Sequence, residues 1–296
     1  MPSARPVCEA MEGDGRMSDA ARSEDRTGER VETVQVAPGN YVIRTSEYLL
    51  NTGLVVGTNK ALVVDTGAGP RQAKRIYAAV RRLTKLPLVV VNTHFHYDHV
   101  FGNDYFAAQG VQDFYAHRSC AHDIAENGAL QRATVAETEP EMANAQGEHT
   151  AIRIPTRLVD TETTVDLGGV SVKLFHLGLG HTDGDLLVGS PSTLFAGDLV
   201  EQGAPPAFED SYPRDWVETL RRISGLRHEY DVLVPGHGQT VSDAFVKNMC
   251  ETMALAVRMG EQASRDTPAD ATKAIPILPY GPVQSRALLQ RLKANR

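Results

Sequence analysis

The sequence predicts an α/β protein in which two β-sheets pack together and helices lie outside them. Strand-like segments rich in Val, Leu and Ile form clusters in both halves of the chain. Segments with a helical period separate these clusters, and glycine, proline or asparagine stands at many of the joins. Strand clusters separated by helices in both halves favour this layered arrangement.

The chain has 296 residues, which is long enough to bury a sizeable core. Residues 1–30 are rich in Ser, Gly, Pro and mixed charge, and we expect a disordered N-terminal tail there. Residues 31–296 are expected to form a single domain. The formal net charge of −7 disfavours a nucleic-acid partner, because an acidic surface repels phosphate.

The sequence predicts a cytoplasmic protein without a membrane segment. The first forty residues contain no apolar run of the kind found in a signal peptide. No stretch approaches the roughly 18 apolar residues that indicate a membrane span. The three cysteines, Cys8, Cys120 and Cys250, show neither a CxxC pair nor a disulfide framework, so we expect reduced thiols.

The first half of the ordered region begins with β-rich segments. Strands are expected at 41–45, 48–56 and 60–67, with a hairpin connection between the last two. A helix is expected at 70–85, where Pro70 suits the first turn. The continuous apolar run at 86–94 is typical of a buried strand.

The alternation of helices and strands continues to the C-terminus. Residues 128–150 are polar and weakly periodic, which fits either a helix or a mobile flap. From residue 152 the pattern becomes β-rich again as far as about residue 200. The remaining predicted elements are helices at 99–109, 118–127, 213–224 and 242–263, strands at 114–117 and 231–235, and a short basic helix at the C-terminus.

The most informative motif is His94-Phe-His96-Tyr-Asp98-His99, which directly follows the apolar strand. In an extended backbone, positions 94 and 96 project in the same direction, so both imidazoles can reach one ion. Asp98 and His99 follow the bend of the chain and can face a second ion nearby. Neutral imidazole and carboxylate are ligands of zinc and similar divalent ions. This spacing therefore predicts a site for two metal ions.

Three further metal-ligand types stand at the ends of predicted strands. His181 lies in Gly-His-Thr-Asp-Gly, Asp198 lies in Ala-Gly-Asp, and His237 lies in Pro-Gly-His-Gly. The glycines allow the backbone to turn sharply beside a site. Each motif alone is weak, but together with the first motif they strengthen the prediction of a metal centre.

These four motifs, in this order, resemble those of the metallo-β-lactamase superfamily, and the resemblance covers residues from about 31 to 260. It implies a four-layer αβ/βα sandwich with a dinuclear site at one edge between the sheets. By position, His94, His96 and His181 are expected to bind the first ion. Asp98, His99 and His237 are expected to bind the second ion, and Asp198 is expected to bridge the two.

The resemblance also implies supporting roles. Asp65, in Val-Val-Asp-Thr-Gly, is expected to orient metal-bound histidines from behind. Thr182 and Asp183 are expected to shape their loop, and Asp98 is expected to orient the nucleophile and shuttle a proton. His176 is a candidate lining residue of the pocket, and Trp216 is expected in the core.

The implied activity is hydrolysis of an ester, thioester, lactone or amide bond in a small molecule by a metal-bridging hydroxide. Two Zn²⁺ ions are the expected cofactor, with Fe or Mn as alternatives. An aspartate at position 198 resembles thioesterases, lactonases and phosphoesterases more than true β-lactamases, although β-lactams stay among the candidate amides. The alternatives are a mononuclear iron persulfide dioxygenase and a non-catalytic binding protein.

Two segments are expected to determine the choice of substrate. Residues 128–152 are polar, and residues 201–212 are rich in proline, as loops beside a pocket often are. Within the second segment, an apolar wall is expected from Ala204, Pro205, Pro206 and Phe208. The sequence does not determine the oligomeric state.

Overall fold

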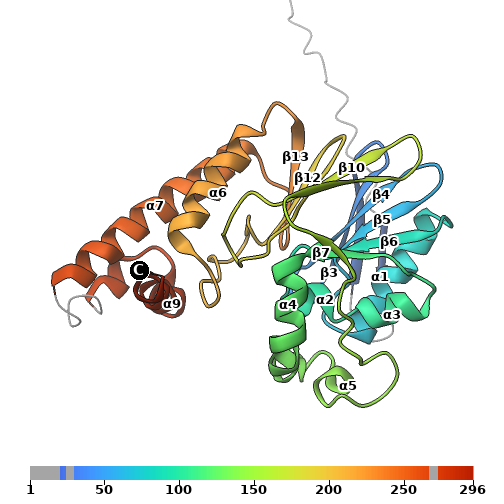
Figure 1. The fold of residues 1–296 in the computed structure, drawn as a ribbon, viewed down its shortest axis with the longest axis horizontal. Coiled ribbons are helices and arrows are strands. Elements are labelled where there is room, and N and C mark those ends of the chain that lie inside the picture. The colour runs from blue at the N-terminus through green and yellow to red at the C-terminus, as the bar shows by residue number, and fades with distance from the viewer. Residues whose placement is uncertain (1–20, 25–29, 267–272, 296) are drawn as a thin grey trace, which may run out of the picture.

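The computed structural model describes residues 21–24, 30–266 and 273–295. Two β-sheets pack face to face, and helices cover the outer face of each sheet (Figure 1). The predicted α/β sandwich of two sheets with helices outside is therefore confirmed. Of the chain's predicted N-terminal tail, residues 1–20 and 25–29 lie outside the described residues.

The first sheet has eight strands in sequential order. Strands β1 to β5 run antiparallel to their neighbours, and β5 to β8 run parallel. The change to parallel pairing follows from the helices that connect these later strands. The strands are β1 (Ala21–Glu24), β2 (Arg30–Ala37), β3 (Asn40–Thr45), β4 (Asn51–Val56), β5 (Ala61–Val64), β6 (Leu88–Val91), β7 (Phe114–His117) and β8 (Arg157–Val159).

The second sheet has five strands in the order β13-β12-β11-β10-β9. Its strands pair antiparallel except for β12 and β13, which are parallel because helix α6 connects them. The strands are β9 (Glu162–Asp166), β10 (Ser171–Phe175), β11 (Leu187–Ser190), β12 (Ser192–Gly197) and β13 (Tyr230–Pro235).

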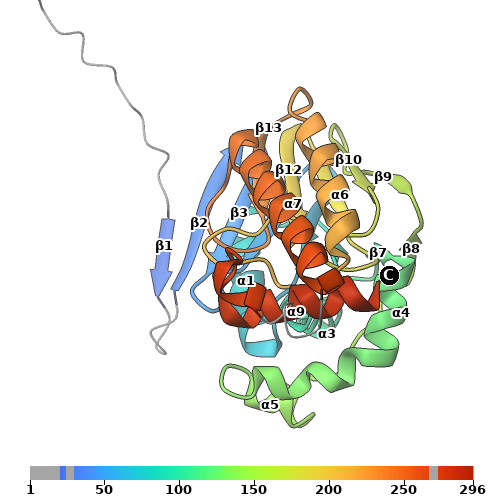
Figure 2. The same ribbon diagram turned by 90° about the vertical axis from the view of Figure 1, so that its left-hand side faces the viewer.

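Helices cover the outer faces of both sheets. Helices α1 and α3 pack on the first sheet through Ile76, Val80 and Phe106. Helices α6 and α7 cover the second sheet, where Figure 2 shows them in front of β12 and β13, and α9 packs against α6 and α7. The helical elements are α1 (Pro70–Leu83), α2 (Tyr97–Val100), α3 (Asn103–Ala108), α4 (Arg118–Asn127), the 3-10 helix η1 (Gly128–Val135), α5 (Pro140–Ala143), α6 (Pro213–Gly225), α7 (Asp243–Asp266), the 3-10 helix η2 (Ile275–Ile277) and α9 (Gly281–Ala294).

The central core lies between the two sheets. Val64 and Val91 of the first sheet share one buried cluster with Val188 and Phe195 of the second sheet. At Gly53 of β4, a Cβ atom would lie 2.6 Å from the ring of Phe195, so the glycine allows the sheets to approach closely. Burial on both faces explains why the strand before the histidine motif is continuously apolar.

Four expectations about local structure differ from the observed elements. Residues 21–24, within the predicted tail, form strand β1 and pair with β2. The predicted helix at 99–109 is divided into α2 and α3. It breaks near Gly102, which packs against the carbonyl of Thr66 and donates its N–H to the carbonyl of Gly67. A tertiary contact therefore overrides the helical pattern.

The other two differences lie beside the predicted site. Strand β4 begins at Asn51 rather than at residue 48, because Tyr48 and Leu49 adopt positive φ values of 58° and 53°. The segment 128–150, predicted as a helix or a flap, folds into η1, α5 and turns. Among the described helices, none combines the length and apolar character needed to cross a membrane.

Candidate metal centre

The predicted ligand residues meet at one edge of the two sheets. His94 and His96 follow the end of β6, and Asp98 and His99 lie in α2 directly after them. His181 follows β10, Asp198 follows β12, and His237 follows β13. Because β6, β12 and β13 all end at this edge, their following loops bring distant residues together.

The first group of donor atoms consists of three imidazoles and one carboxylate, from His94, His96, His181 and Asp198. Nδ1 of His96 lies 3.1 Å from Nε2 of His94 and 2.9 Å from Nε2 of His181. Oδ2 of Asp198 lies 3.7 Å from Nε2 of both His94 and His181. Such a compact set of nitrogen and oxygen donors suits a divalent ion.

The second group consists of Asp98, His99 and His237. Nε2 of His237 lies 3.3 Å from both Nε2 of His99 and Oδ2 of Asp98. Asp198 also reaches this group, because its two oxygens lie 3.4 Å from His99 and from His237. Asp198 is therefore placed between the two groups.

The second ring nitrogen of each histidine faces an oxygen-bearing partner. Nδ1 of His237 donates to the carbonyl oxygen of Tyr48 at 2.7 Å. Nε2 of His96 lies 3.1 Å from Oδ2 of Asp210, and Nδ1 of His181 lies 3.5 Å from Oε1 of Glu201. Such outer partners fix the tautomer and the ring orientation, so the remaining nitrogen faces the site with its lone pair.

Asp65 orients the other two histidines from behind. Its Oδ2 lies 2.8 Å from Nδ1 of His99 and accepts a hydrogen bond from Oγ1 of Thr93 at 2.8 Å. Oγ1 of Thr93 in turn lies 3.0 Å from Nδ1 of His94. The backbone of Asp65 adopts a positive φ of 64°, which is uncommon for a residue other than glycine. Its contacts agree with the supporting position that the sequence predicts.

Burial and neighbouring charges act in opposite directions on the titratable groups. Burial lowers the pKa of His94 well below its ordinary value and that of His181 to about 3. Burial also lowers the pKa of His237, but the carboxylates of Asp198 and Asp98 outweigh it and raise the pKa to about 9. The carboxylates and imidazoles of the two donor groups thus act strongly on each other's charge.

The donor set fits divalent ions. Oδ1 of Asp198 is buried and has no hydrogen-bond partner among the described residues. A buried carboxylate oxygen without a partner is costly unless something else binds it. At Gly236, a Cβ atom would collide with this oxygen, so the glycine keeps the space around Asp198 open. These features agree with a site built around metal ions.

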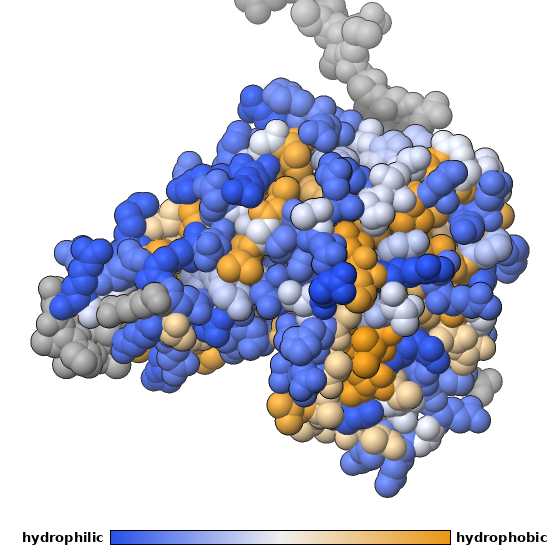
Figure 3. All heavy atoms as spheres, viewed as in Figure 1, coloured by the Kyte–Doolittle hydropathy of each residue, from blue (hydrophilic) through white to orange (hydrophobic). Residues whose placement is uncertain are grey.

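The donor atoms lie on the floor of a cavity of about 880 Å³, which His96, Asp98, His181, Asp198 and His237 help to line. Figure 3 shows a notch at the lower edge of the molecule, between the part formed by α6, α7 and α9 and the part that contains α4 and α5. Lining residues come from both parts, for example Gln284 of α9 and Asn127 of α4. A cavity of this size can hold a small organic molecule.

The sequence analysis did not identify three partners of the histidines. Glu201 and Asp210 lie in the segment that was predicted to determine substrate choice, but neither was singled out. The carbonyl of Tyr48 has no side-chain signature at all. A carboxylate three residues after the Asp198 ligand is the one local pattern that points to Glu201.

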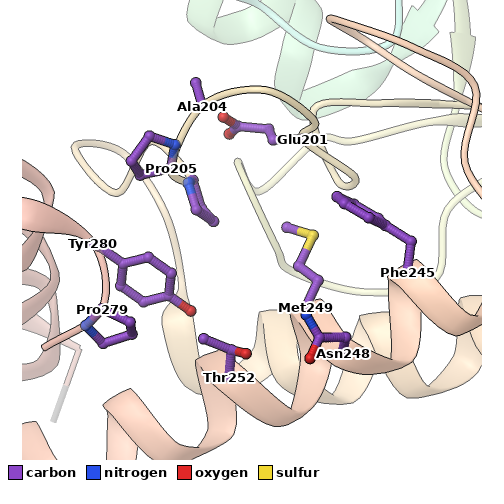
Figure 4. A pocket seen from close by; sticks show the side chains of 10 residues that line it. Glu201, Ala204, Pro205, Phe245, Asn248, Met249, Thr252, Pro279 and Tyr280 are labelled. Carbon is purple, nitrogen blue, oxygen red and sulfur yellow. The ribbon is translucent and has the colours of Figure 1, made fainter.

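The predicted apolar wall is only partly correct. Ala204 lines the cavity, but Phe208 is fully buried against Trp216 in the helical core. Pro205 and Pro206 line a second hollow of about 260 Å³ on another side of their segment. Figure 4 shows Pro205 beside Ala204 in this hollow, with Phe245 and Met249 of α7 across from them. Glu201 lines both spaces.

The structure also bears on the predictions for the loop after His181 and for His176. The loop after His181 is held by Asp185, whose oxygens accept hydrogen bonds from the N–H and the hydroxyl of Thr182. Thr182 therefore shapes the loop as predicted, and Asp185 is its partner there. His176 stacks on His117 with ring centroids 4.4 Å apart and does not appear among the described lining residues of the cavity.

The comparison of sequences with known families gives a direct result. A family profile for the metallo-beta-lactamase superfamily matches residues 48–237. The chain belongs to the metallo-beta-lactamase superfamily. The matched range contains all seven residues of the two donor groups, so the superfamily resemblance and the geometry concern the same site.

Several members of the superfamily are similar to this chain. Metallo-beta-lactamase type 2 of Bacillus cereus is 24% identical over 202 residues, which are 66% of this chain and 70% of that protein. The acyl-coenzyme A thioesterase MBLAC2 of Homo sapiens is 27% identical over 214 residues, covering 64% of this chain and 73% of that protein. A linear primary-alkylsulfatase of a Pseudomonas species is 24% identical, with 61% of this chain and 40% of that protein covered.

Solved structures support the fold. A metallo-beta-lactamase from Pontibacter korlensis superposes with a TM-score of 0.57 and 21% sequence identity, covering 80% of this chain and 99% of that chain. At this identity, the superposition establishes a common metallo-beta-lactamase fold and leaves the reaction of this chain to be derived from its own site.

Proposed function

We propose that this protein is a dinuclear metal-dependent hydrolase that cleaves an ester, thioester, lactone or amide bond in a small molecule. One observation carries the proposal. Five imidazole nitrogens and two carboxylates converge on the floor of one cavity, in two groups that Asp198 connects. Hydrogen-bonding partners face the second nitrogen of four of the five imidazoles, and Glu201 lies 3.5 Å from that of His181, as expected for the outer partners of metal ligands.

The residues divide into two ligand sets. His94, His96 and His181 would hold one divalent ion, and Asp98, His99 and His237 would hold the other, with Asp198 shared. Two such ions supply a water of lowered pKa and polarise the carbonyl group of a substrate. Zn²⁺ suits this mixture of imidazole and carboxylate, and Fe or Mn are also compatible with it.

The chain's own residues then determine orientation and proton transfer. Asp98 is placed at the cavity wall, with Oδ2 3.3 Å from Nε2 of His237, where it can orient a water and accept its proton. His94 and His99 are almost fully buried and are held through Asp65, so their rings cannot turn away during the reaction. No serine, cysteine or lysine nucleophile is required.

The test is metal content per chain by mass spectrometry, together with turnover of a panel. The panel contains an aryl ester, a thioester, a homoserine lactone, a chromogenic cephalosporin and an aryl phosphodiester. Two ions per chain and turnover of one carboxylic acid derivative are expected. A single iron ion, no hydrolysis and oxygen uptake with glutathione persulfide would instead indicate a persulfide dioxygenase. Metal binding without any turnover would indicate a binding protein.

A further inference from the structure

The described wall of the metal cavity contains acidic residues but no lysine or arginine. The acidic residues outside the two donor groups are Glu201, Glu209 and Asp210. Asp98 and Asp198 also line the cavity, but the ions that they would hold offset their charge. Anionic groups of ligands are usually bound by arginine or lysine, so this wall offers no such partner.

Two of these acids lie at the rim and are not part of the donor groups. The side chain of Asp210 is 53% exposed, although its Oδ2 contacts His96. Glu209 is exposed and accepts a hydrogen bond from Nε2 of Gln284 at 2.9 Å. Both are exposed and line the cavity, so they place negative charge at its mouth.

A basic side chain close to this rim is Arg291, and its contacts hold it to the backbone. It donates to the carbonyl oxygen of Ser211 at 2.6 Å and to that of Asp210 at 3.2 Å. Its guanidinium lies over the ring of Tyr212. Arg291 is absent from the described lining of the cavity, so it is not placed to pair with an anionic group bound there, although its charge acts on the carboxylate of Asp210.

Other parts of the cavity wall are apolar. Leu49 is 51% exposed and Leu130 is 78% exposed, and both line the cavity together with Phe95 and Tyr97. The positive φ of Leu49 and the hydrogen bond from the N–H of Gly238 to its carbonyl fix the course of the chain there. Exposed leucines beside a cavity are typical of a surface that binds an apolar group.

We infer that the substrate is an uncharged or cationic carboxylic acid derivative with an apolar body, and that substrates with a carboxylate, sulfate or phosphate group are disfavoured. This inference rests on the proposed hydrolase function. Acyl-coenzyme A and alkyl sulfates, which the names of two relatives contain, are both anions. This cavity therefore selects a different class of substrate from those two relatives.

Three matched esters test the inference on the full, metal-loaded chain. They are the 4-nitrophenyl esters of pentanoic acid, of glutaric acid and of 4-(trimethylammonio)butanoic acid, which carry a neutral, an anionic and a cationic end. At low salt, kcat/KM corrected for spontaneous hydrolysis is expected to be at least about tenfold higher for the neutral and cationic esters than for the anionic one. Added salt should reduce this preference. Equal or faster turnover of the anionic ester would overturn the inference.

A binding measurement separates this inference from the proposed function. The three matching ketones, in which CH2 replaces the ester oxygen, resist hydrolysis, and calorimetry gives their affinities. If no ester is turned over, the hydrolase proposal fails, and the ketones still report on charge selection. Equal or tighter binding of the anionic ketone would overturn the inference in that case as well.

A charge reversal at the rim gives a second test. Glu209→Lys is expected to shift the ratio of anionic to cationic ester turnover by about fivefold in favour of the anion. Glu229→Lys makes the same change of net charge at an exposed position outside the described cavity lining and should leave the ratio unchanged. No shift with Glu209→Lys, or an equal shift with both variants, would contradict the inference that the acidic rim selects against anionic substrates.

Discussion

Oδ2 of Asp65 lies 2.8 Å from Nδ1 of His99, and this contact turns Nε2 of His99 toward the second donor group. Burial alone would lower the pKa of His99, but Asp198, Asp65 and Asp98 outweigh it and raise the pKa well above its ordinary value. Because an imidazole must be neutral to bind a metal ion, this shift opposes metal binding at His99.

The variant Asp65→Asn should weaken metal binding by about 10- to 100-fold, because it removes the charged acceptor behind His99. Asparagine tolerates the positive φ of this position, so the fold should be retained. Competition with a chromophoric chelator measures the affinity. Asp231→Asn, at an exposed position in β13, is the matched control. Equal affinities of the two variants would show that Asp65 does not position the ligand.

Asp98→Ala should abolish hydrolysis, because it removes both a donor to the second ion and the carboxylate that accepts a proton from water. The buried histidines keep their outer partners, so the fold should persist and circular dichroism should be unchanged. Turnover and metal content per chain are the measurements, with Asp231→Ala as the control. Unchanged turnover in the Asp98 variant would refute its assigned role.

Gly236→Ala should disturb the centre without adding charge. The new methyl group would collide with Oδ1 of Asp198 and displace the shared carboxylate. We expect a loss of activity of at least about 100-fold and fewer than two ions per chain. Gly225→Ala is the control, because a Cβ there meets nothing within 4 Å. Full metal occupancy and activity in the Gly236 variant would show that the position of Asp198 is not critical.

Removal of metal by a chelator should abolish activity and lower the Tm by about 5–10 °C, since ligands that bind only the folded state stabilise it. The carboxylates of Asp98 and Asp198, which both contact Nε2 of His237, would then lack the charge of the ions. Differential scanning calorimetry before and after chelation measures the effect. Restoration of both Tm and activity by Zn²⁺ is expected, and an unchanged Tm would argue against a structural contribution of the metal.

A pH effect on stability is expected from Asp123 in α4. Burial and its neighbour Asp183, with which it shares a hydrogen bond, raise the pKa of Asp123 to about 6. Since this is above the value of 3.8 expected in the unfolded chain, the folded state holds the proton more tightly. The contribution of Asp123 to the free energy of unfolding is therefore fully present below about pH 4, and it is lost as the pH rises through 6.

Asp123→Asn should therefore stabilise the protein at pH 7–8 by about 1 kcal/mol, a value reduced for the partial exposure of the side chain. At pH 4 the gain should vanish. Urea unfolding at both pH values measures it. A gain of equal size at both pH values would show that the effect does not arise from titration of Asp123.

The sequence by itself determined the two-sheet fold class and the seven residues that meet at the centre. Both rest on local patterns. Apolar runs mark buried strands, and His94 to His99 place four potential ligands within six residues. Because the other ligands also follow strands, their convergence required only that these strands end at one edge.

Only the tertiary structure decided what surrounds the centre. His96 meets Asp210 across 114 positions, and His237 meets the carbonyl of Tyr48 across 189. No local pattern encodes such pairs, and a backbone carbonyl has no sequence signature. Phe208 turned inward because the packing of α6 buries it against Trp216. The acidic cavity wall likewise combines residues from several loops, so its charge emerges only when the chain is folded.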